Sequence, residues 1–435
     1  MVNYFRAYYF LQGLLRRAYW SHERMQDYQN RKLRQILQYA YVHVPYYHER
    51  FKKLGIRPSD IKTVKDLNIL PILRKEDIRS NLGKMISREF DVVKLQIRRT
   101  SGSTGEPLYF YISNSEDEYR KAKHLRANMG CGQKPRDRWV MITSPMYFNQ
   151  ATKLQRITGI FAPLSVSVYD HVNSQVSTIS KLKPDVVDGY ASSILLLARE
   201  IEKKGVDSIR PKLLISGADL IEPHSRKFVE KVINAPFFDQ YGCAELERLA
   251  WQCEEKAGYH IDADSVIMQF VDENGEEVAP GERGEIVCTS LFNYAMPFIR
   301  YAVGDVGKAS RMNDCPCGRT LPLMEVIEGR RDSVVLLPDG RALSSFVFIA
   351  ATYQLSFYNN IEKFRVIQKR IDKFEFIIKL KGNNIDECLA EEELKNLFCK
   401  VFNVNADMVE FKVEFVDDIP LDRGGKFRIF VSEIE

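Results

Sequence analysis

The sequence predicts an α/β protein in which a largely parallel sheet is followed by a hairpin-rich region and a small α+β unit. Between residues 137 and 240, short β-rich runs alternate with helical ones, as in strand–helix–strand crossovers. After residue 262, strand-like runs follow one another directly, which favours hairpins. The chain has 435 residues, of which 45% are hydrophobic and 28% charged, so it is long enough for two or three domains with substantial cores.

The N-terminal region predicts helices. Residues 1–20 are aromatic and apolar, but Arg6, Arg16 and Arg17 interrupt them, which excludes a signal peptide and a membrane span. An amphipathic helix at a membrane surface and a helix packed on its own protein both fit this segment, and we favour the second. Apolar positions at helical spacing predict one or two helices within 22–53. Residues 70–77 predict a turn that caps another helix.

The central region supplies the alternating elements. We expect a helix that opens at Ser115–Glu118, where acidic residues favour a helix N-terminus. Strands are predicted at 109–112, 139–143, 165–168, 186–189, 213–216 and 237–239, and further helices at 192–204 and 223–234.

The C-terminal region changes character twice. Residues 266–271 and 285–290 predict antiparallel strands around the Asn274-Gly275 turn. A compact α+β unit of about one hundred residues then follows, within the usual size of a small domain. Its expected elements are paired strands at 364–369 and 374–380, a helix at 391–402 and a strand at 409–415.

Charge and cysteine content narrow the functional classes. The net charge is +5, and no Lys/Arg block is dense enough to indicate nucleic-acid binding. A mild basic excess suits small phosphorylated or carboxylate substrates. Eight unevenly spaced cysteines indicate a reducing compartment, so we predict a cytoplasmic protein. The sequence leaves a homodimer open.

The run with the clearest chemical character lies between residues 99 and 107. Its hydroxyl and glycine residues are Thr100, Ser101, Gly102, Ser103, Thr104 and Gly105. Glycines allow tight turns that bring backbone N–H groups to an anion, and the hydroxyls are further donors. No Gly-Lys-Ser/Thr ending follows, so this is not a Walker loop. Taken alone, a phosphate-binding loop and an ordinary linker are equally compatible with it.

Five segments in a fixed order carry a family resemblance. They are Thr100–Pro107, Asp239–Glu245, Arg300–Asp305, Glu328–Asp332 and Arg423–Arg428. With them the chain resembles the adenylate-forming (acyl-CoA synthetase, ANL) superfamily, and most of all the phenylacetate–CoA ligase branch with its relatives in capsular polysaccharide biosynthesis. The match runs from about residue 33 onward.

The resemblance implies an architecture and an activity. It implies a large N-terminal domain over residues 1–330, with mixed sheets, flanking helices and a small β subdomain. It also implies a small mobile α+β C-terminal domain over residues 331–435, pivoting near the hinge residue Asp332. The implied reaction is ATP- and Mg²⁺-dependent activation of a small carboxylate to an acyl-adenylate with release of pyrophosphate. The acyl group then passes to a thiol, with CoA as the expected acceptor and an aryl or arylacetic acid as the default substrate.

The resemblance also assigns roles to individual residues. The Thr100–Gly105 loop holds the β- and γ-phosphates, and Glu245 offers an oxygen ligand to Mg²⁺. Tyr241 provides an aromatic face for adenine, Asp305 accepts from the ribose hydroxyls and Arg330 assists. Lys426 is the catalytic lysine that meets the departing phosphate oxygen. Further nucleotide-binding residues are Ser216, Gly217, Ala218, Asp239 and Gly242.

Two alternatives to thioester formation stay open. The acyl group or AMP itself could pass to an amine or hydroxyl in polysaccharide or cofactor biosynthesis. The chain could also be an ATP-binding pseudoenzyme, although the presence of Glu245, Asp305 and Lys426 argues against this. Cys243 and Ala244 replace the small hydroxyl pair that the family often carries before the glutamate.

A second group of residues predicts a metal site. Cys253, His260, Cys315 and Cys317 provide three thiolates and one imidazole, the ligand set of a structural Zn²⁺. The first two follow the Glu245 segment and the other two follow the Asp305 segment, so one ion could join both. Four unconnected residues are the alternative, with the cysteines as small apolar fillers. We favour zinc, in a structural role because four protein ligands leave no position for substrate.

Overall fold

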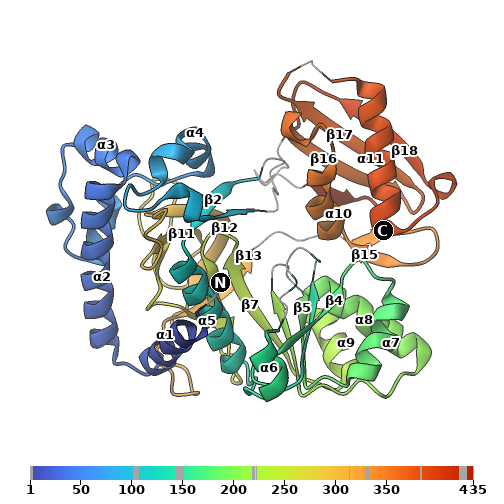
Figure 1. Cartoon of the computed structure of the whole chain (residues 1–435), viewed down its shortest axis with the longest axis horizontal. Coiled ribbons are helices and arrows are strands. Elements are labelled where there is room, and N and C mark those ends of the chain that lie inside the picture. The colour runs from blue at the N-terminus through green and yellow to red at the C-terminus, as the bar shows by residue number, and fades with distance from the viewer. Residues whose placement is uncertain are drawn as a thin grey trace. The chain divides into compact units, whose positions relative to one another are not determined.

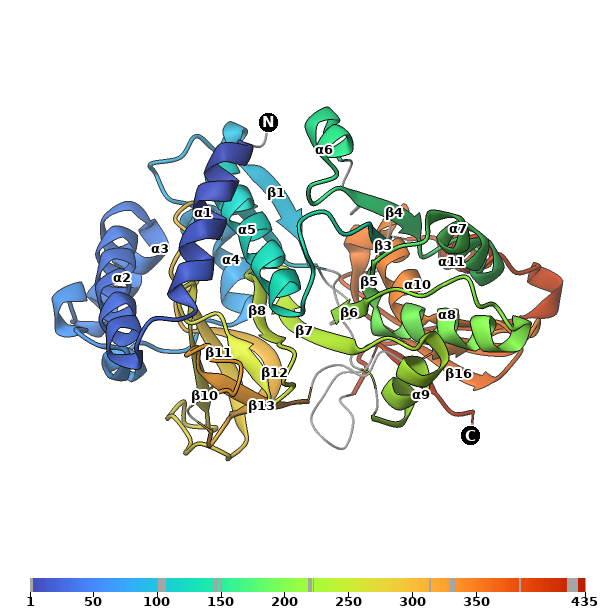
Figure 2. The same cartoon turned by 90° about the horizontal axis from the view of Figure 1, so that it is seen from below.

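The computed structural model of the protein divides the chain into two compact units (Figures 1 and 2). The first contains residues 1–99, 108–134 and 238–329, and the second contains residues 100–107, 135–237 and 330–435. The residues that the structure describes are 3–100, 107–143, 145, 148, 151–217, 221, 223–312, 314–328, 334–382, 385–420 and 429–434.

The first unit combines five helices with an antiparallel sheet and a separate hairpin in its described residues. Its helices are α1 (Tyr4–Arg17), α2 (His22–His43), α3 (Pro45–Leu54), α4 (Lys75–Met85) and α5 (Asn114–Gly130), with short 3₁₀ turns at Pro58–Asp60, Val64–Ile69 and Val92–Lys94. Its strands are β1 (Gln96–Arg99), β2 (Tyr109–Ile112), β7 (Phe237–Cys243), β8 (Glu247–Gln252), β9 (Tyr259–Ile261), β10 (Val266–Val271), β11 (Gly284–Ser290), β12 (Tyr301–Ala309) and β13 (Leu323–Glu328).

The sheet of the first unit runs in the order β10-β11-β12-β13-β9-β8-β7, and every one of these neighbours is antiparallel. The predicted antiparallel pair is confirmed as β10 and β11, with Val266 opposite Ser290. Predicted helix capping is confirmed at α4, where the Arg74 backbone N–H donates to the Asp77 carboxylate over 2.9 Å. Strand β8 was not expected from the sequence, although it connects two of the predicted site segments.

The N-terminal helix α1 packs along α5 (Figure 2). Leu11 and Leu14 of α1 are buried in this contact, and Ser113 caps the start of α5. The favoured interpretation of residues 1–20, a helix packed on its own protein, is confirmed. Helix α5 also packs against β8 and so connects the N-terminal segment with the sheet.

The second unit combines a parallel sheet with a four-stranded α+β region. Its strands are β3 (Trp139–Thr143), β4 (Pro163–Ser167), β5 (Val186–Tyr190), β6 (Leu213–Gly217), β14 (Val334–Leu336), β15 (Ala342–Ser344), β16 (Ile361–Arg370), β17 (Lys373–Leu380), β18 (Glu410–Phe415) and β19 (Phe430–Ser432). Its helices are α6 (Lys153–Thr158), α7 (Val172–Leu182), α8 (Ala191–Lys204), α9 (Pro223–Ile233), α10 (Ser345–Ala351) and α11 (Glu387–Phe402), with 3₁₀ turns at Thr352–Gln354, Tyr358–Asn360 and Ala406–Met408.

The predicted parallel sheet is confirmed by the pairs β3–β4, β3–β5 and β5–β6. Helix α8 buries Ile194, Leu197, Ala198 and Ile201, whose spacing places them on one face. The predicted C-terminal strand pair is confirmed as β16 and β17, which are antiparallel, while β18 and β19 join in parallel at the edges. One apolar core contains side chains from both parts of this unit.

The predicted domain boundary between residues 330 and 331 stays a prediction. The two compact units group residues 330–435 together with residues 135–237. Among the described helices, none combines the length and the apolar character needed to cross a bilayer.

Candidate functional site

The flanks of the predicted phosphate loop are held together by a β-hairpin. Strands β1 and β2 are antiparallel, and Arg99 lies opposite Tyr109. Thr100 follows β1 directly and is half-buried. The two ends of the loop therefore start from one fixed place. The remaining loop residues with a predicted role, Ser101, Gly102, Ser103, Thr104 and Gly105, lie outside the described residues.

Other predicted residues divide between the second unit and the undescribed parts of the chain. Ser216 and Gly217 are the last residues of β6, where Gly217 lies opposite Tyr190 of β5. The carboxyl end of a parallel strand is the usual place for a ligand in an open α/β sheet. Ala218, Arg330, Asp332 and Lys426 lie outside the described residues.

The structure brings the adenine and ribose candidates into direct contact. The Tyr241 hydroxyl on β7 donates to Asp305 Oδ2 on β12 over 2.9 Å. Tyr241 is buried, and burial together with the nearby Asp305 carboxylate raises the pKa of its hydroxyl well above the ordinary value. The phenol therefore stays protonated and can keep this hydrogen bond. Two segments that are far apart in the sequence thus form one polar site.

Asp239 and Gly242 stabilise the backbone around Tyr241. The Asp239 carboxylate accepts from the Tyr259 hydroxyl over 2.8 Å, which ties β7 to β9. A Cβ atom on Gly242 would lie 2.3 Å from the Glu247 carbonyl oxygen, closer than real Cβ contacts. Glycine is required here because the two backbones approach closely at an irregularity in the β7–β8 pairing.

Glu245, the predicted Mg²⁺ ligand, is buried in the turn between β7 and β8. Its Oε1 atom accepts a hydrogen bond from the Tyr301 hydroxyl at the start of β12. Tyr301 belongs to the predicted Arg300–Asp305 segment but had no assigned role. It orients the carboxylate from the same strand that carries Asp305.

Two cations of α5 hold the turn that carries Glu245. Arg120 donates from Nη2 to the Ala244 carbonyl over 2.7 Å and from Nη1 to the Glu245 carbonyl over 2.9 Å. Lys123 Nζ donates to the Leu246 carbonyl over 3.1 Å. Three consecutive backbone carbonyls are therefore held by side chains of one helix.

Sequence reasoning missed these positioning residues. Arg120, Lys123 and Arg126 recur every three residues, and a charged stripe of this kind usually faces solvent. All three are buried in the structure. Burial lowers the pKa of Lys123 to about 8, although the nearby Asp262 carboxylate opposes the shift. The sequence feature that could have revealed these buried cations is the lack of an apolar face on α5, a helix of seventeen residues.

Glu247 is an acidic partner of the buried cation Arg120 on α5. Its carboxylate pairs with Arg120 over 3.1 Å and lies 3.4 Å from His124 Nδ1. Burial alone would raise the pKa of Glu247, but the His124 hydrogen bond and the charge of Arg120 hold it far below its usual range. The residue is ionised at neutral pH and neutralises the cation that holds the turn.

The predicted cysteine and histidine ligands form one cluster in the first unit. The ligand atoms of Cys253, His260, Cys315 and Cys317 all lie within 4.8 Å of one another. Cys253 Sγ lies 3.6 Å from Cys315 Sγ, and Cys317 Sγ lies 3.3 Å from His260 Nε2. A zinc tetrahedron has ligand–ligand edges of about 3.5–3.8 Å, given its usual bond lengths. The Cys253–Cys315 and Cys317–His260 separations are close to these edges, and all four ligand atoms lie within 4.8 Å of one another.

The surroundings of the cluster also suit a metal. His260 Nδ1 lies 3.4 Å from the Leu321 carbonyl oxygen, which turns Nε2 toward the sulfurs. Burial lowers the pKa of His260 to about 4, so its imidazole is neutral at physiological pH, as a ligand must be. Apolar side chains, including Ala127 and Leu323, enclose the sulfurs.

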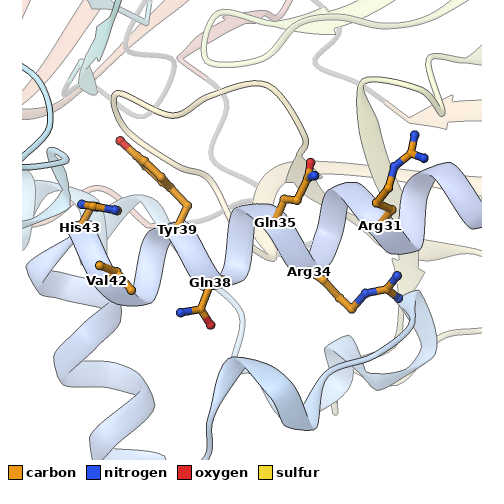
Figure 3. Close-up of a pocket in the computed structure, with 7 residues that line it drawn as sticks. All are labelled: Arg31, Arg34, Gln35, Gln38, Tyr39, Val42 and His43. Carbon is orange, nitrogen blue, oxygen red and sulfur yellow. The ribbon is translucent and has the colours of Figure 1, made fainter.

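A separate groove lies along α2 (Figure 3). Its lining residues are Arg31, Arg34, Gln35, Gln38, Tyr39, Val42 and His43. Figure 3 shows that all of these side chains project from the same helix. None of the predicted site residues lines this groove, so it is not the predicted nucleotide site.

Comparison with characterised proteins gives a consistent set of relatives. Residues 336–433 match the family described as the CapK C-terminal domain. A phenylacetate-coenzyme A ligase from Pseudomonas putida is 28% identical, with 73% of each chain covered. Another from Escherichia coli K12 is 25% identical over 94% of this chain and 95% of that protein. Protein CapK from Staphylococcus aureus is 24% identical over 94% of this chain and 89% of its own length.

Solved structures share the fold. A 2-hydroxyisobutyryl-CoA ligase in complex with 2-HIB-AMP and CoA has a TM-score of 0.67 at 21% identity, covering 96% of this chain and 91% of that one. The same enzyme in its postadenylation state with 2-HIB-AMP has a TM-score of 0.64 with the same coverage. The predicted fold, an adenylate-forming α/β architecture with a C-terminal domain, is confirmed.

Proposed function

The chain belongs to the adenylate-forming enzymes, in the branch of phenylacetate–coenzyme A ligases and CapK, and on this premise we propose that it activates an organic acid with ATP and transfers the acyl group to the thiol of CoA. As a member of this branch it is an enzyme of the AMP-forming acid–CoA ligase type. The proposal also covers the identity of the acid and of the final acceptor. An aryl or arylacetic acid is our default substrate.

The proposed reaction has two steps. A carboxylate oxygen attacks the α-phosphorus of ATP, and the bond to the bridging oxygen breaks so that pyrophosphate leaves. The sulfur of the thiol then attacks the acyl carbon, a thioester forms, and AMP leaves with the former carboxylate oxygen. Both steps need fixed donors and cations around oxygens that gain negative charge.

The observation that carries the proposal is the contact between Tyr241 and Asp305. Their 2.9 Å hydrogen bond connects β7 and β12, so the adenine and ribose candidates lie where one nucleoside could meet both. Because Asp305 Oδ2 already accepts from Tyr241, we assign Oδ1 to the ribose hydroxyls. The nearby Gly304 has a φ of +94°, a left-handed conformation that suits glycine.

Glu245 fits the role of Mg²⁺ ligand by its chemistry and by its orientation. Carboxylate oxygen is the donor that Mg²⁺ prefers, and the Tyr301 hydrogen bond fixes the orientation of this carboxylate. When bound, Mg²⁺ supplies positive charge against the phosphate oxygens. Arg120 and Lys123 act through the backbone of the 244–246 turn and so position Glu245.

Three further assignments complete the proposed mechanism. We assign Lys426 to the departing phosphate oxygen, Thr100–Gly105 to the terminal phosphates and Asp332 to the pivot of a C-terminal domain that begins at residue 331. We also propose a cytoplasmic location, which is consistent with eight cysteines that form no disulfide.

The decisive experiment measures pyrophosphate release across a panel of aryl, arylacetic and short hydroxy acids. We expect release that requires both an acid and Mg²⁺, followed by a CoA thioester detectable by mass spectrometry. Release that requires only an amine or hydroxyl acceptor would assign the alternative acyl or AMP transfer. Normal ATP binding without release for any acid would identify a pseudoenzyme.

Lys426→Ala tests the assigned catalytic lysine. The substitution removes the cation from the leaving oxygen, so we expect adenylation to be lost while ATP binding is retained. Lys381→Ala, which changes a lysine outside the five resembling segments, serves as the control. Normal turnover in Lys426→Ala would show that the assignment of this lysine is wrong.

We further propose that the cysteine–histidine cluster binds one structural Zn²⁺. The ligand set and the 3.3–3.6 Å separations support this proposal. Bound there, the ion would join the end of β8 to the loop between β12 and β13, next to the segments that carry Glu245 and Asp305.

Metal analysis tests the zinc proposal. Protein purified without chelator should contain about one zinc per chain, and Cys315→Ser should lower this content sharply. Cys288→Ser is the matched control, because Cys288 is equally buried but does not belong to the cluster. Absence of zinc from the unmodified protein would overturn the proposal.

A further inference from the structure

Helix α1 is apolar on two opposite faces. Its inner face buries Leu11 and Leu14 against α5. Its outer face carries Phe5, Tyr8 and Tyr9, whose exposed fractions are 90%, 63% and 71%. At 100° per residue these three aromatic positions fall on one side of the helix. A helix that is apolar on both sides is typical of a buried position, so the outer aromatic face is a candidate contact surface.

The N-terminal segment that contains this face is rich in cations. Residues 1–22 contain no Asp or Glu. Residues 1–60 contain eleven Lys or Arg against four Asp or Glu, whereas the whole chain contains 63 against 58, so the net positive charge originates in this segment. Arg16, which is exposed, continues the aromatic stripe at helical spacing.

The acidic groups that meet α1 are already paired. The buried Glu118 carboxylate accepts from Arg6 and from the Asn3 backbone, and the buried Asp264 carboxylate pairs with Arg17 over 2.8 Å. Because these two carboxylates are paired, the outer face of α1 is an aromatic surface with the positive charge of Arg16 at one end. Aromatic side chains that combine an apolar ring with a polar tip favour the interface between lipid and water.

We propose that the outer face of α1 docks on a membrane surface rich in anionic phospholipid headgroups. The aromatic rings of Phe5, Tyr8 and Tyr9 enter the headgroup region, and Arg16 meets the lipid charge. A second copy of the chain is a poorer occupant, since a two-fold contact through α1 would place two acid-free basic segments against each other. The proposal goes beyond the ligase activity and does not depend on it.

A natural fluorophore lies just after the C-terminal end of α1. Trp20 follows α1, stacks edge-to-face on Tyr28 and lies under the guanidinium of Arg24, 4.0 Å from the ring centre. The other two tryptophans, Trp139 and Trp251, are buried. Quenching of Trp20 by brominated lipid would therefore indicate approach of the N-terminal helix to the bilayer.

The test is co-sedimentation of the full chain with vesicles of phosphatidylcholine containing 30% phosphatidylglycerol, or of phosphatidylcholine alone. We expect binding to the anionic vesicles that weakens as salt is raised, with quenching of Trp20 by brominated phosphatidylglycerol. Replacing Phe5, Tyr8 and Tyr9 together by Ser should lower the partition coefficient by about tenfold or more. The charge reversal Arg16→Glu should weaken binding to a lesser extent.

The matched control is the double substitution Leu154→Ser and Ile157→Ser on α6. Both side chains are strongly exposed, at 67% and 82%, but belong to a different helix. The control should bind as the unmodified chain does, and thermal unfolding should confirm that every variant is folded. Equal binding to both vesicle types, no binding to either, or a dimer that dissociates in the triple variant would each overturn the proposal.

Discussion

The two units bury their central helices in opposite ways. In the first unit, α5 places Arg120, Lys123 and Arg126 inside the protein, where carbonyls and carboxylates surround them. In the second unit, α11 buries Leu394 and Phe398 in an apolar core, as α8 does with its own apolar face. At these helices, the first unit relies on directional contacts and the second on close packing.

The difference indicates what each unit is built to do. Apolar burial is non-directional and contributes stability in proportion to area. A buried polar network adds little net stability, but it fixes the groups it contacts in one arrangement. The polar unit carries Glu245, Tyr241 and Asp305, and the roles proposed for these residues require their positions to be fixed before a charged substrate arrives.

The largest expected effect is the loss of one partner in the polar core. Arg126 lies 2.6 Å from Asp262 and 2.8 Å from Asp264. Arg126→Ala leaves two buried carboxylates short of a cation, and we expect the free energy of unfolding to fall by about 3–5 kcal/mol. Urea denaturation measures the loss. Adding Asp262→Asn to Arg126→Ala should recover part of it, because one uncompensated charge is removed.

The apolar core supplies the comparison for this prediction. Phe398→Ala should cost about 3–5 kcal/mol through lost burial and a cavity, and no neutralising second substitution should recover it. If Asp262→Asn fails to restore stability to Arg126→Ala, the contrast between ionic and apolar cores is wrong.

The next largest expected effect is a difference between the two units in their stability at acidic pH. Burial would raise the pKa of Asp264, but the charges of Arg126 and Arg17 hold it below its usual range, and Glu247 is lowered as well. Groups with a lowered folded pKa stabilise the protein above their unfolded pKa, here about 4, and lose this contribution as the pH falls. Asp262 opposes the trend, because burial raises its pKa. We expect a net loss of about 2 kcal/mol in the first unit below pH 4.

Tryptophan fluorescence measures this separation, because Trp251 lies in the first unit and Trp139 in the second. Variants that retain only Trp251 or only Trp139, with Trp20 replaced by Phe in both, should show the Trp251 transition at higher pH than the Trp139 transition. Coincident transitions would mean that the surface carboxylates of the second unit respond equally, and the comparison would lose its basis.

The smallest effect should come from loosening the Glu245 turn without removing charge. Arg120→Lys keeps the cation but cannot span the Ala244 and Glu245 carbonyls. We expect about tenfold weaker binding of Mg·ATP by calorimetry, about 1.4 kcal/mol, with little change in the melting temperature. Lys121→Met is the control, since Lys121 pairs with Asp117 on the same helix. Unchanged Mg·ATP affinity in an active Arg120→Lys enzyme would limit Arg120 to a structural role.

Local sequence patterns were sufficient to predict most of the helices and strands. Residues 139–143 and 186–189 were predicted as strands, and residues 192–204 as a helix, because their apolar spacing matches the geometry of each element. Strand β8 was missed because it follows a site segment with polar residues at its start. The polar side of α5 was missed for a related reason: Arg120 finds its partners more than one hundred residues away.

The sequence by itself determined the α/β class and the five ordered segments, and it singled out the four cysteine and histidine residues that cluster in the structure. Residue types and their order carry that information, because hydroxyls, carboxylates and thiolates have fixed chemistry. Only the tertiary structure decided that Tyr241 meets Asp305, that Tyr301 orients Glu245 and that the outer face of α1 stays exposed. Such contacts depend on long-range geometry and on desolvation, and neither of these produces a periodic pattern of residues in the sequence.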